Sequence, residues 1–401
     1  MTTRAGSAPD RPAGFDSRYR TALLDWLACA AAGSREPAAR VVRETADGLL
    51  GRVAAAGAAG HVLDYDDTYL PGLAHLSAPT APVALVLGAE RGAGVGDVLE
   101  AYAEGFASAG ALTAANHPSL RERGWHPTAL CGAPAAAVTA ARLLGLDARS
   151  RRRAVALSLL RAGGLVGAFG SDGKSLQVGM AAAAGVEAAL LAAAGASVRE
   201  EAVEQGFEAA YGARLTLVAD HTAIDENWIK AYPCCLQTHS AIEAAEQARE
   251  RGGLTAARIE VVVHPVSLQA AVIRDPADGL EAKFSIPYLV AYTLLRGAPT
   301  VDTFRGVDEE ARVLASRRVS VRTDARLMES EAVIEAERGD ELARVEAALG
   351  SPARPMDPQR LRAKVRDLAG DDLEGVLDDA ATPAATVVAA AGLGQPRGES
   401  A

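Results

Sequence analysis

Apolar residues recur at helical spacing over most of the first 250 positions of the chain. A repeat of three to four residues predicts helices, and glycines or glycine-containing turns mark where most of these helices end. Because the segments are apolar on several faces, they favour helices packed in layers rather than helices lying on a surface. The helices predicted in this way cover residues 18–33, 78–90, 97–115, 133–144, 151–160 and 180–194.

The pattern changes after about residue 250. Residues 258–265 (RIEVVVHP) are rich in valine and are stopped by proline, which is typical of a strand. Residues 317–324 predict a second strand, and residues 281–297 a helix between the two. Residues 331–349 fit a hairpin that turns at 338–340, although the second arm also suits a helix.

These patterns predict a mainly α protein with two domains. A large all-helical domain would consist of residues 15–245 together with 357–401, where helical patterning returns. A smaller α+β domain would consist of residues 246–356. Residues 1–14 are polar and rich in proline and glycine, which predicts a disordered tail.

Composition and charge indicate how the helices pack and which ligands the protein can bind. Hydrophobic residues make up 49% of the chain but aromatic residues only 4%, so small alanine side chains should let helices approach closely. The formal net charge is −10, without the basic stripe that marks a nucleic-acid interface. An acidic protein that binds an acidic substrate must concentrate its cations locally, which directs attention to lysine or arginine in polar motifs.

The cellular location is predicted from the absence of an export signal and of a membrane-spanning segment in the sequence. The chain start has no apolar segment of the kind found in export signals. Residues 180–196 are the most apolar stretch, but they contain Glu187 and favour a buried helix over a membrane span. The cysteines at 29, 131, 234 and 235 have no zinc-ligand spacing. We therefore expect a cytoplasmic protein with reduced cysteines and without a nucleic-acid or membrane partner.

The first polar cluster lies in residues 61–75 (HVLDYDDTYLPGLAH), which contain His61, Asp64, Asp66, Asp67, Thr68 and His75. If its start is helical, Asp64 and Thr68 share one face. Three nearby carboxylates should raise the pKa of at least one of them, which suits proton transfer. Two alternatives stay open: a helix cap in a solvated turn, and a metal site made by Asp64, Asp66, Asp67 and His75.

Three further clusters carry candidate chemistry. His126 and Thr128 precede an alanine-rich helix, where a histidine can orient a substrate oxygen. Lys174 follows Gly173 at a helix start, but Ala168 stands where a phosphate loop requires glycine, so a carboxylate-binding corner fits better. The last cluster contains Lys230, Tyr232, Cys234 and His239. It lacks the oxyanion loop and orienting residue that a cysteine nucleophile needs.

Seven stretches in this order resemble the MmgE/PrpD family, which includes 2-methylcitrate dehydratases, cis-aconitate decarboxylases and an iminodisuccinate epimerase. They extend from about residue 20 to residue 297. The stretches are LLDWLACAAAG, HVLDYDDT followed by His75, GWHPTALCG, the GLD at 145–147, GKSLQVGMAAAAG, KAYPCCLQTHSAIEAA and EAKFSIPYLVAYTLLRG.

The resemblance implies a helical domain, a smaller α+β lid and an active site in the cleft between them. It also implies a homodimer that needs no metal or organic cofactor. By motif, the family's pocket residues fall on Asp64, Thr68, His75, His126, Lys174 and His239. We assign catalytic roles to Asp64, His75, His126 and Lys174, and substrate contacts to Thr68, Asp67, Lys230, Tyr232 and His239.

Departures from the family bear on the substrate. The region between residues 38 and 56 is short, residues 105–111 replace a charged pair by small residues, and the spacing from Thr68 to His75 is one residue longer. Val272 also replaces a tyrosine of the decarboxylase branch. We therefore expect a cofactor-independent lyase acting on a small polar carboxylate, with dehydration ahead of epimerisation or decarboxylation. A homologue that binds a metabolite or partner without catalysis is the alternative.

Overall fold

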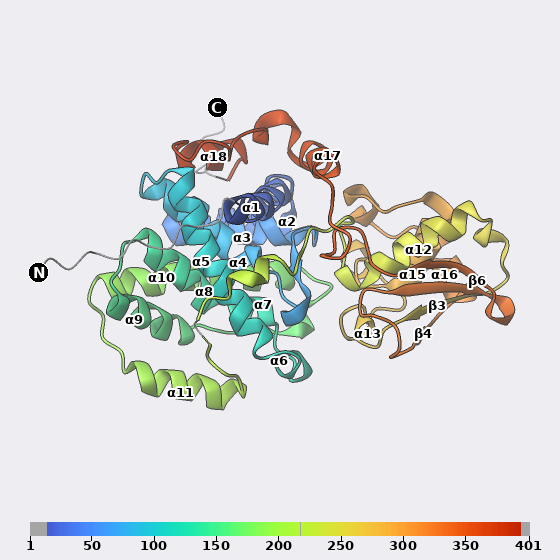
Figure 1. The fold of residues 1–401 in the computed structure, drawn as a ribbon, viewed down its shortest axis with the longest axis horizontal. Helices are drawn as coiled ribbons and strands as arrows, with labels where there is room; N and C mark the ends of the chain where they lie inside the picture. The colour runs from blue at the N-terminus through green and yellow to red at the C-terminus, as the bar shows by residue number, and fades with distance from the viewer. Residues whose placement is uncertain (1–13, 217, 394–401) are drawn as a thin grey trace, which may run out of the picture.

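The computed structural model describes residues 14–216 and 218–393, so the predicted tail lies outside the described residues except for Gly14. Figure 1 shows a large helical body beside a smaller part that contains a sheet, which confirms the mainly α prediction. The helices of the body are α1 (Gly14–Gly33), α2 (Pro37–Thr45), α3 (Gly48–Val62), α4 (Ser77–Glu90), α5 (Val95–Ala114), α6 (Ser119–Glu122), α7 (Pro127–Leu130), α8 (Gly132–Leu143), α9 (Ala148–Leu159), α10 (Gly173–Ala193) and α11 (Glu200–Tyr211).

The last helices of the chain return to this body, where α17 (Pro358–Ala369) packs against α1 and α18 (Ala384–Ala390) against α4 (Figure 1). A buried ion pair fixes the first of these contacts, because Lys364 Nζ lies 2.6 Å from Asp25 Oδ1. The helical body is thus assembled from both ends of the described chain.

Helix α10 is the central element of the body and packs against α3, α8 and α9. Among the described residues it is the one helix that is long and apolar enough to cross a membrane, by length and composition only. Within its most apolar window, 56% of the residues are buried in the fold. Its packing agrees with the buried helix predicted for this stretch.

Close approach of α10 to α3 depends on glycine. A Cβ atom built on Gly179 would lie 2.2 Å from the Ala54 carbonyl oxygen, whereas one built on Gly206 in α11 has no neighbour within 4 Å. We expect Gly179→Ala to lower the free energy of unfolding by about 1–3 kcal/mol through overpacking. The control Gly206→Ala should instead raise it by about 0.5–1 kcal/mol through helix propensity. Urea unfolding measures both, and equal effects would contradict the packing argument.

The smaller part holds a four-stranded sheet in the order β4-β3-β5-β6. Strand β3 runs parallel to β4 and antiparallel to β5, and Val261 lies opposite both Val321 and Ile334. The strands are β3 (Ile259–Val263), β4 (Val319–Thr323), β5 (Ala332–Ala336) and β6 (Glu341–Val345). The predicted strands and the hairpin are confirmed, and the helical alternative for the second arm is wrong.

Helices of the smaller part are α12 (His239–Glu250), α13 (Ser267–Ala270), α14 (Gly279–Ala282), α15 (Ile286–Arg296) and α16 (Glu309–Arg318). The single helix predicted over 281–297 is divided, because Ser285 caps a new helix by accepting a hydrogen bond from the Tyr288 amide. Helix α12 packs on β5, β6 and α15. One side of the sheet is thereby covered.

Two short strands join the body to the segment that leads into the sheet. In β1 (Thr68–Tyr69) and β2 (Asn227–Trp228), Thr68 pairs with Trp228 and Tyr69 with Asn227 in antiparallel register. The polar cluster at 61–75 therefore lies at the junction between the two parts of the molecule.

Candidate active site

The site begins where α3 ends. The chain leaves the helix at Val62, and Asp64 has a φ of 53°, a left-handed conformation that aspartate tolerates better than most residues. Thr68 lies in β1. The prediction that Asp64 and Thr68 share a helix face is therefore wrong. The turn instead directs Asp64, only 2% exposed, into the junction.

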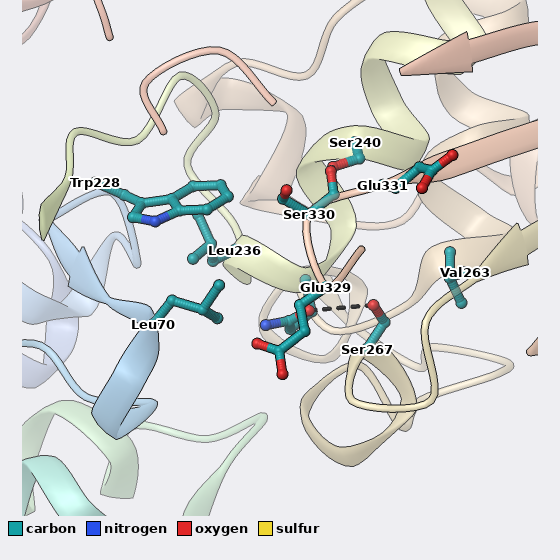
Figure 2. Close-up of a pocket in the computed structure, with 10 residues that line it drawn as sticks. Leu70, Trp228, Leu236, Ser240, Val263, Ser267, Glu329, Ser330 and Glu331 are labelled. Atoms are coloured by element: carbon teal, nitrogen blue, oxygen red, sulfur yellow. Dashed lines mark hydrogen bonds between the residues drawn. The ribbon is translucent and has the colours of Figure 1, made fainter. Parts of the chain in front are cut away.

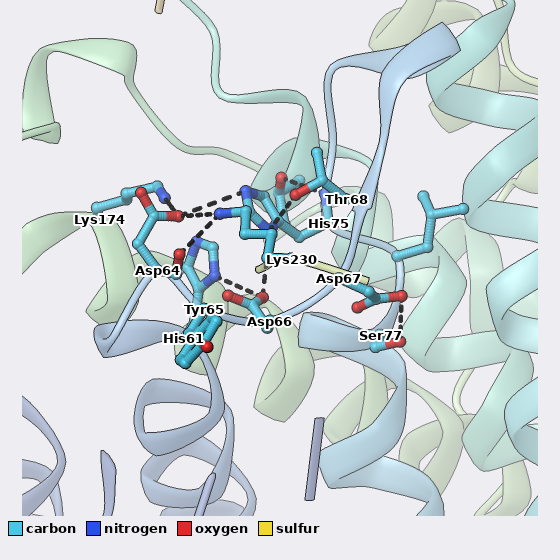
Figure 3. A network of polar contacts seen from close by, with 12 residues as sticks. His61, Asp64, Tyr65, Asp66, Asp67, Thr68, His75, Ser77, Lys174 and Lys230 are labelled. Atoms are coloured by element: carbon cyan, nitrogen blue, oxygen red, sulfur yellow. Dashed lines mark hydrogen bonds and ion pairs between the residues drawn. The ribbon is translucent and has the colours of Figure 1, made fainter. Parts of the chain in front are cut away.

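Two lysines from distant segments meet at the Asp64 carboxylate (Figure 3). Lys174 Nζ donates to Asp64 Oδ1 at 2.7 Å, and Lys230 Nζ donates to the same oxygen and to the Asp64 carbonyl, both at 2.8 Å. Burial alone would raise the pKa of Asp64, but the two lysine charges outweigh it and hold the pKa well below its usual range. Asp64 is therefore an ionised carboxylate that orients two ammonium groups.

The lysines of this protein are concentrated in this region. The chain has four lysines, and all four are buried, with exposed fractions between 1% and 7%. Lys283 donates to the carbonyls of Leu63 and Pro233, and Lys364 to those of Tyr65 and Lys230. Buried ammonium groups are thus concentrated at the junction, as expected for an acidic protein that binds an acidic ligand.

Asp66 sets the orientation of two histidines. Its Oδ2 atom lies 2.8 Å from His61 Nδ1 and 3.2 Å from His75 Nδ1. An ionised carboxylate only accepts hydrogen bonds, so both imidazoles carry their proton on Nδ1 and keep a lone pair on Nε2. Burial lowers the pKa of His75 to about 3, although Asp66 acts in the opposite direction. His75 Nε2, 3.9 Å from Asp64 Oδ1, is therefore a neutral proton acceptor.

His126 has the opposite tautomer. The Gln177 amide is fixed because its oxygen accepts from the Leu165 amide, so Gln177 Nε2 donates to His126 Nδ1 at 2.7 Å. The ring proton then lies on Nε2, where it can be donated. Burial lowers the pKa of His126 well below its usual range, and the ring stacks 6.2 Å from that of His61. One histidine thus offers a lone pair and another a proton.

Asp67 faces away from the lysines, as Figure 3 shows. Its Oδ2 accepts hydrogen bonds from Ser77 Oγ and Asn227 Nδ2, both at 2.7 Å. Burial raises the pKa of Asp67 to about 8, so the expected upward shift falls on this carboxylate, and repulsion from Asp66 adds to it. All three aspartates are buried, which makes the solvated-turn alternative wrong.

The raised pKa of Asp67 predicts a pH dependence of stability. Between about pH 4 and pH 8 the folded protein keeps a proton that the unfolded chain releases, so this residue lowers stability as pH rises. Asp67→Asn removes the titrating carboxyl group but keeps a side-chain oxygen that can accept hydrogen bonds from Ser77 and Asn227. We expect its stability relative to the natural protein to increase by about 1 kcal/mol or more from pH 5 to pH 8. Urea unfolding at both pH values measures this, and parallel profiles would contradict it.

Tyr232 and His239 lie beside this constellation rather than within it. The Tyr232 hydroxyl donates to Glu246 at 2.7 Å, and His239 Nε2 lies 3.3 Å from the Cys234 carbonyl. No hydrogen bond or ion pair among the described residues joins either side chain to Asp64 or Lys174. Burial raises the pKa of the Cys234 thiol to about 12, which argues against a thiolate nucleophile.

The structure also permits a metal site to be tested for fit. His61, Asp66 and His75 offer ligand atoms within 4.8 Å of one another, a set that has His61 in place of the predicted Asp64 and Asp67. A metal ion bound through Nδ1 of both rings would displace the two protons that hydrogen-bond to Asp66. It would also lie near the Lys174 and Lys230 ammonium groups. The protonated arrangement and ligation through Nδ1 exclude each other.

Little space remains at the junction in this conformation. The cavity beside Asp64, Lys174 and Lys283 measures about 20 Å³, room for about one water molecule. Figure 2 shows a second hollow, about 10 Å³, between Trp228 of the body and Ser267 and Glu329 of the smaller part. A cleft of about 1150 Å³ shares Val62, Asp172 and Leu280 with the first cavity. An organic substrate beside Asp64 therefore needs more room than this conformation leaves.

The structure unites the four predicted catalytic residues, with Thr68 and Lys230 beside them. Thr68 Oγ1 lies 3.4 Å from His75 Nδ1, and the Thr128 hydroxyl accepts from the His75 amide. The sequence analysis assigned no catalytic or substrate-binding role to His61, Asp66, Gln177 or Lys283, although Asp66 was a ligand in the metal-site alternative. The first two lie inside the polar cluster, which was the available signal. Gln177 lies in α10, three residues after Lys174.

Comparisons with known proteins match both parts of the chain to the same family. The family model described as MmgE/PrpD N-terminal domain matches residues 7–217, and the MmgE/PrpD C-terminal domain matches residues 232–385. A cis-aconitate decarboxylase of Homo sapiens is 30% identical over 270 residues, covering 62% of this chain but 56% of the relative. A cis-aconitate decarboxylase of Aspergillus terreus is 27% identical over 428 residues, covering 90% of this chain and 86% of the relative. The chain thus matches little more than half the length of the human relative.

Proposed function

This chain belongs to the MmgE/PrpD family, and from that premise we propose that it is a lyase that removes CO2 from a small unsaturated polycarboxylate without an organic cofactor. The observation that carries the proposal is the buried Asp64 carboxylate shared by Lys174 and Lys230, with the His75 lone pair 3.9 Å away. The names of the relatives support decarboxylation ahead of the dehydration expected from sequence.

The chemistry follows from where charge develops. When the C–C bond to the departing carboxylate breaks, its electron pair stays on the substrate and is delocalised towards a remaining carboxylate. Lys174 and Lys230 stabilise that negative charge, and His126 Nε2–H donates to a carboxylate oxygen. A polyanionic substrate raises the pKa of His75, so that it gains a proton and delivers it to carbon. CO2 leaves, and one proton replaces it.

The experiment is a turnover assay with cis-aconitate, related unsaturated polycarboxylates and their hydroxy acids. Release of CO2 together with a product one carboxylate smaller, observed by NMR, would support the proposal. Loss of water without CO2 would identify a dehydratase. Binding without turnover of any compound would favour the non-catalytic reading. Activity that disappears after dialysis against a chelator and returns with metal would show a metal requirement, for which His61, Asp66 and His75 offer ligand atoms.

We also propose that the protein forms the homodimer that the family resemblance implied. Exposed apolar side chains on α10 and just after α9 support a self-association face, with Met180 63% exposed and Leu160 62% exposed. Light scattering coupled to size-exclusion chromatography tests this, and a monomer at micromolar concentration would contradict it.

A further inference from the structure

Arg121 is a buried cation without a counter-ion. It lies in α6 at the junction and is 9% exposed. Its Nη2 donates to the Gln269 carbonyl at 2.8 Å, whereas its Nε has no hydrogen-bond partner. No carboxylate of a described residue lies within ion-pair distance of it. Burial lowers the pKa of Arg121, and the Cys235 thiol is the one electrostatic neighbour that opposes this shift. Burying an unpaired charge is costly, so an unpaired guanidinium at a candidate site indicates a missing anion.

The surroundings of Arg121 connect it to the site. Its guanidinium carbon lies 5.1 Å from the centre of the Phe169 ring, and Lys174 Nζ lies 5.4 Å from the centre of the same ring. The His126 ring meets Phe169 edge-on at 4.9 Å. One aromatic ring thus separates the unpaired guanidinium from a lysine and a histidine of the constellation.

We propose that Arg121 binds a second carboxylate of the substrate, which makes the site selective for di- and tricarboxylates over monocarboxylates. This inference rests on the proposed function, because it assumes that one carboxylate occupies the Lys174 and His126 region. A guanidinium presents a planar fork of donors that matches a carboxylate in a bidentate pair. The Nε–H group is not used by Gln269 and has no hydrogen-bond partner, so it remains for this anion.

The hydrogen bond to Gln269 gives a competing explanation. Gln269 belongs to α13 in the smaller part of the molecule, so Arg121 could act only as a latch that holds the two parts together. A latch would affect every ligand equally. A carboxylate contact affects only ligands that carry the second carboxylate, and this difference decides between the two.

The test measures binding of propane-1,2,3-tricarboxylate by isothermal titration calorimetry and binding of butyrate by ligand-observed NMR. Arg121→Gln is compared with Arg123→Gln, which removes the same charge from an exposed position two residues away. We expect Arg121→Gln to weaken tricarboxylate binding about 10- to 100-fold. Butyrate binding should change less than threefold, and Arg123→Gln should alter neither. Arg121→Lys, which keeps the charge but loses the fork, should give an intermediate loss.

Three results would overturn the inference: no tricarboxylate binding or no tricarboxylate preference in the natural protein, unchanged tricarboxylate affinity in Arg121→Gln, or an equal loss for both probes. The last result would establish the latch. Because both probes report binding without turnover, a failed cis-aconitate assay leaves this test intact.

Discussion

Lys174→Ala is expected to reduce kcat/KM about a hundred- to thousand-fold, which is typical for loss of one charged group that stabilises developing negative charge. Lys174 is 7% exposed and lies 5.4 Å and 5.3 Å from the ring centres of Phe169 and Phe284, so its charge acts in an environment with little water to screen it. The fold should survive, because Asp64 Oδ1 keeps Lys230 as its partner at 2.8 Å.

The measurement combines steady-state kinetics with thermal unfolding. Arg149→Ala is the matched control, because Arg149 occupies the second position of α9 as Lys174 does in α10, but is exposed. Its activity should match that of the natural protein. A near-normal rate in Lys174→Ala would contradict the proposed role, and a large loss of unfolding temperature would show that the lysine is needed for folding instead.

The sequence predicted which residues form the site better than it predicted how their side chains are oriented. The family resemblance implied that residues from the separate polar clusters share one pocket. Asp64, His126 and Lys174 do meet there, although they come from three separate segments. Which way each side chain points could not be predicted. The left-handed turn at Asp64 and the pairing of β1 with β2 direct Asp67 towards Asn227, and both depend on contacts with distant segments.

The same limit applies to the fold. Segments that are apolar on several faces were predicted as helices at 78–90 and 180–194, whereas α3 (GLLGRVAAAGAAGHV), which is interrupted by glycines, was missed. Its glycines and alanines instead permit close contact with α10, where a Cβ on Gly57 would lie 2.9 Å from Gly179 Cα. Small residues carry packing information that a pattern of hydrophobicity does not reveal.

His75→Asn is expected to lower kcat about 10²- to 10⁴-fold through loss of general acid–base catalysis. Asparagine places an amide nitrogen near the position of Nδ1, so it can still donate to Asp66 Oδ2, 3.2 Å away in the natural protein. What it removes is Nε2, the atom that faces Asp64 and that we propose carries the transferred proton. The substitution therefore separates proton transfer from the structural role of the ring.

Binding and pH dependence distinguish this explanation from simple disruption of the pocket. Affinity for propane-1,2,3-tricarboxylate should stay within a few-fold, because the lysines and His126 remain, while the limb of the pH–rate profile that reports His75 should disappear. His264→Gln, a half-buried histidine of the sheet-containing part, serves as the control and should keep both the rate and the profile. If His75→Asn retained the natural kcat and pH profile, the proton would have to come from another group. His61 would then be the next candidate, because its Nε2 is buried without a partner and its ring centre lies 4.5 Å from that of His75.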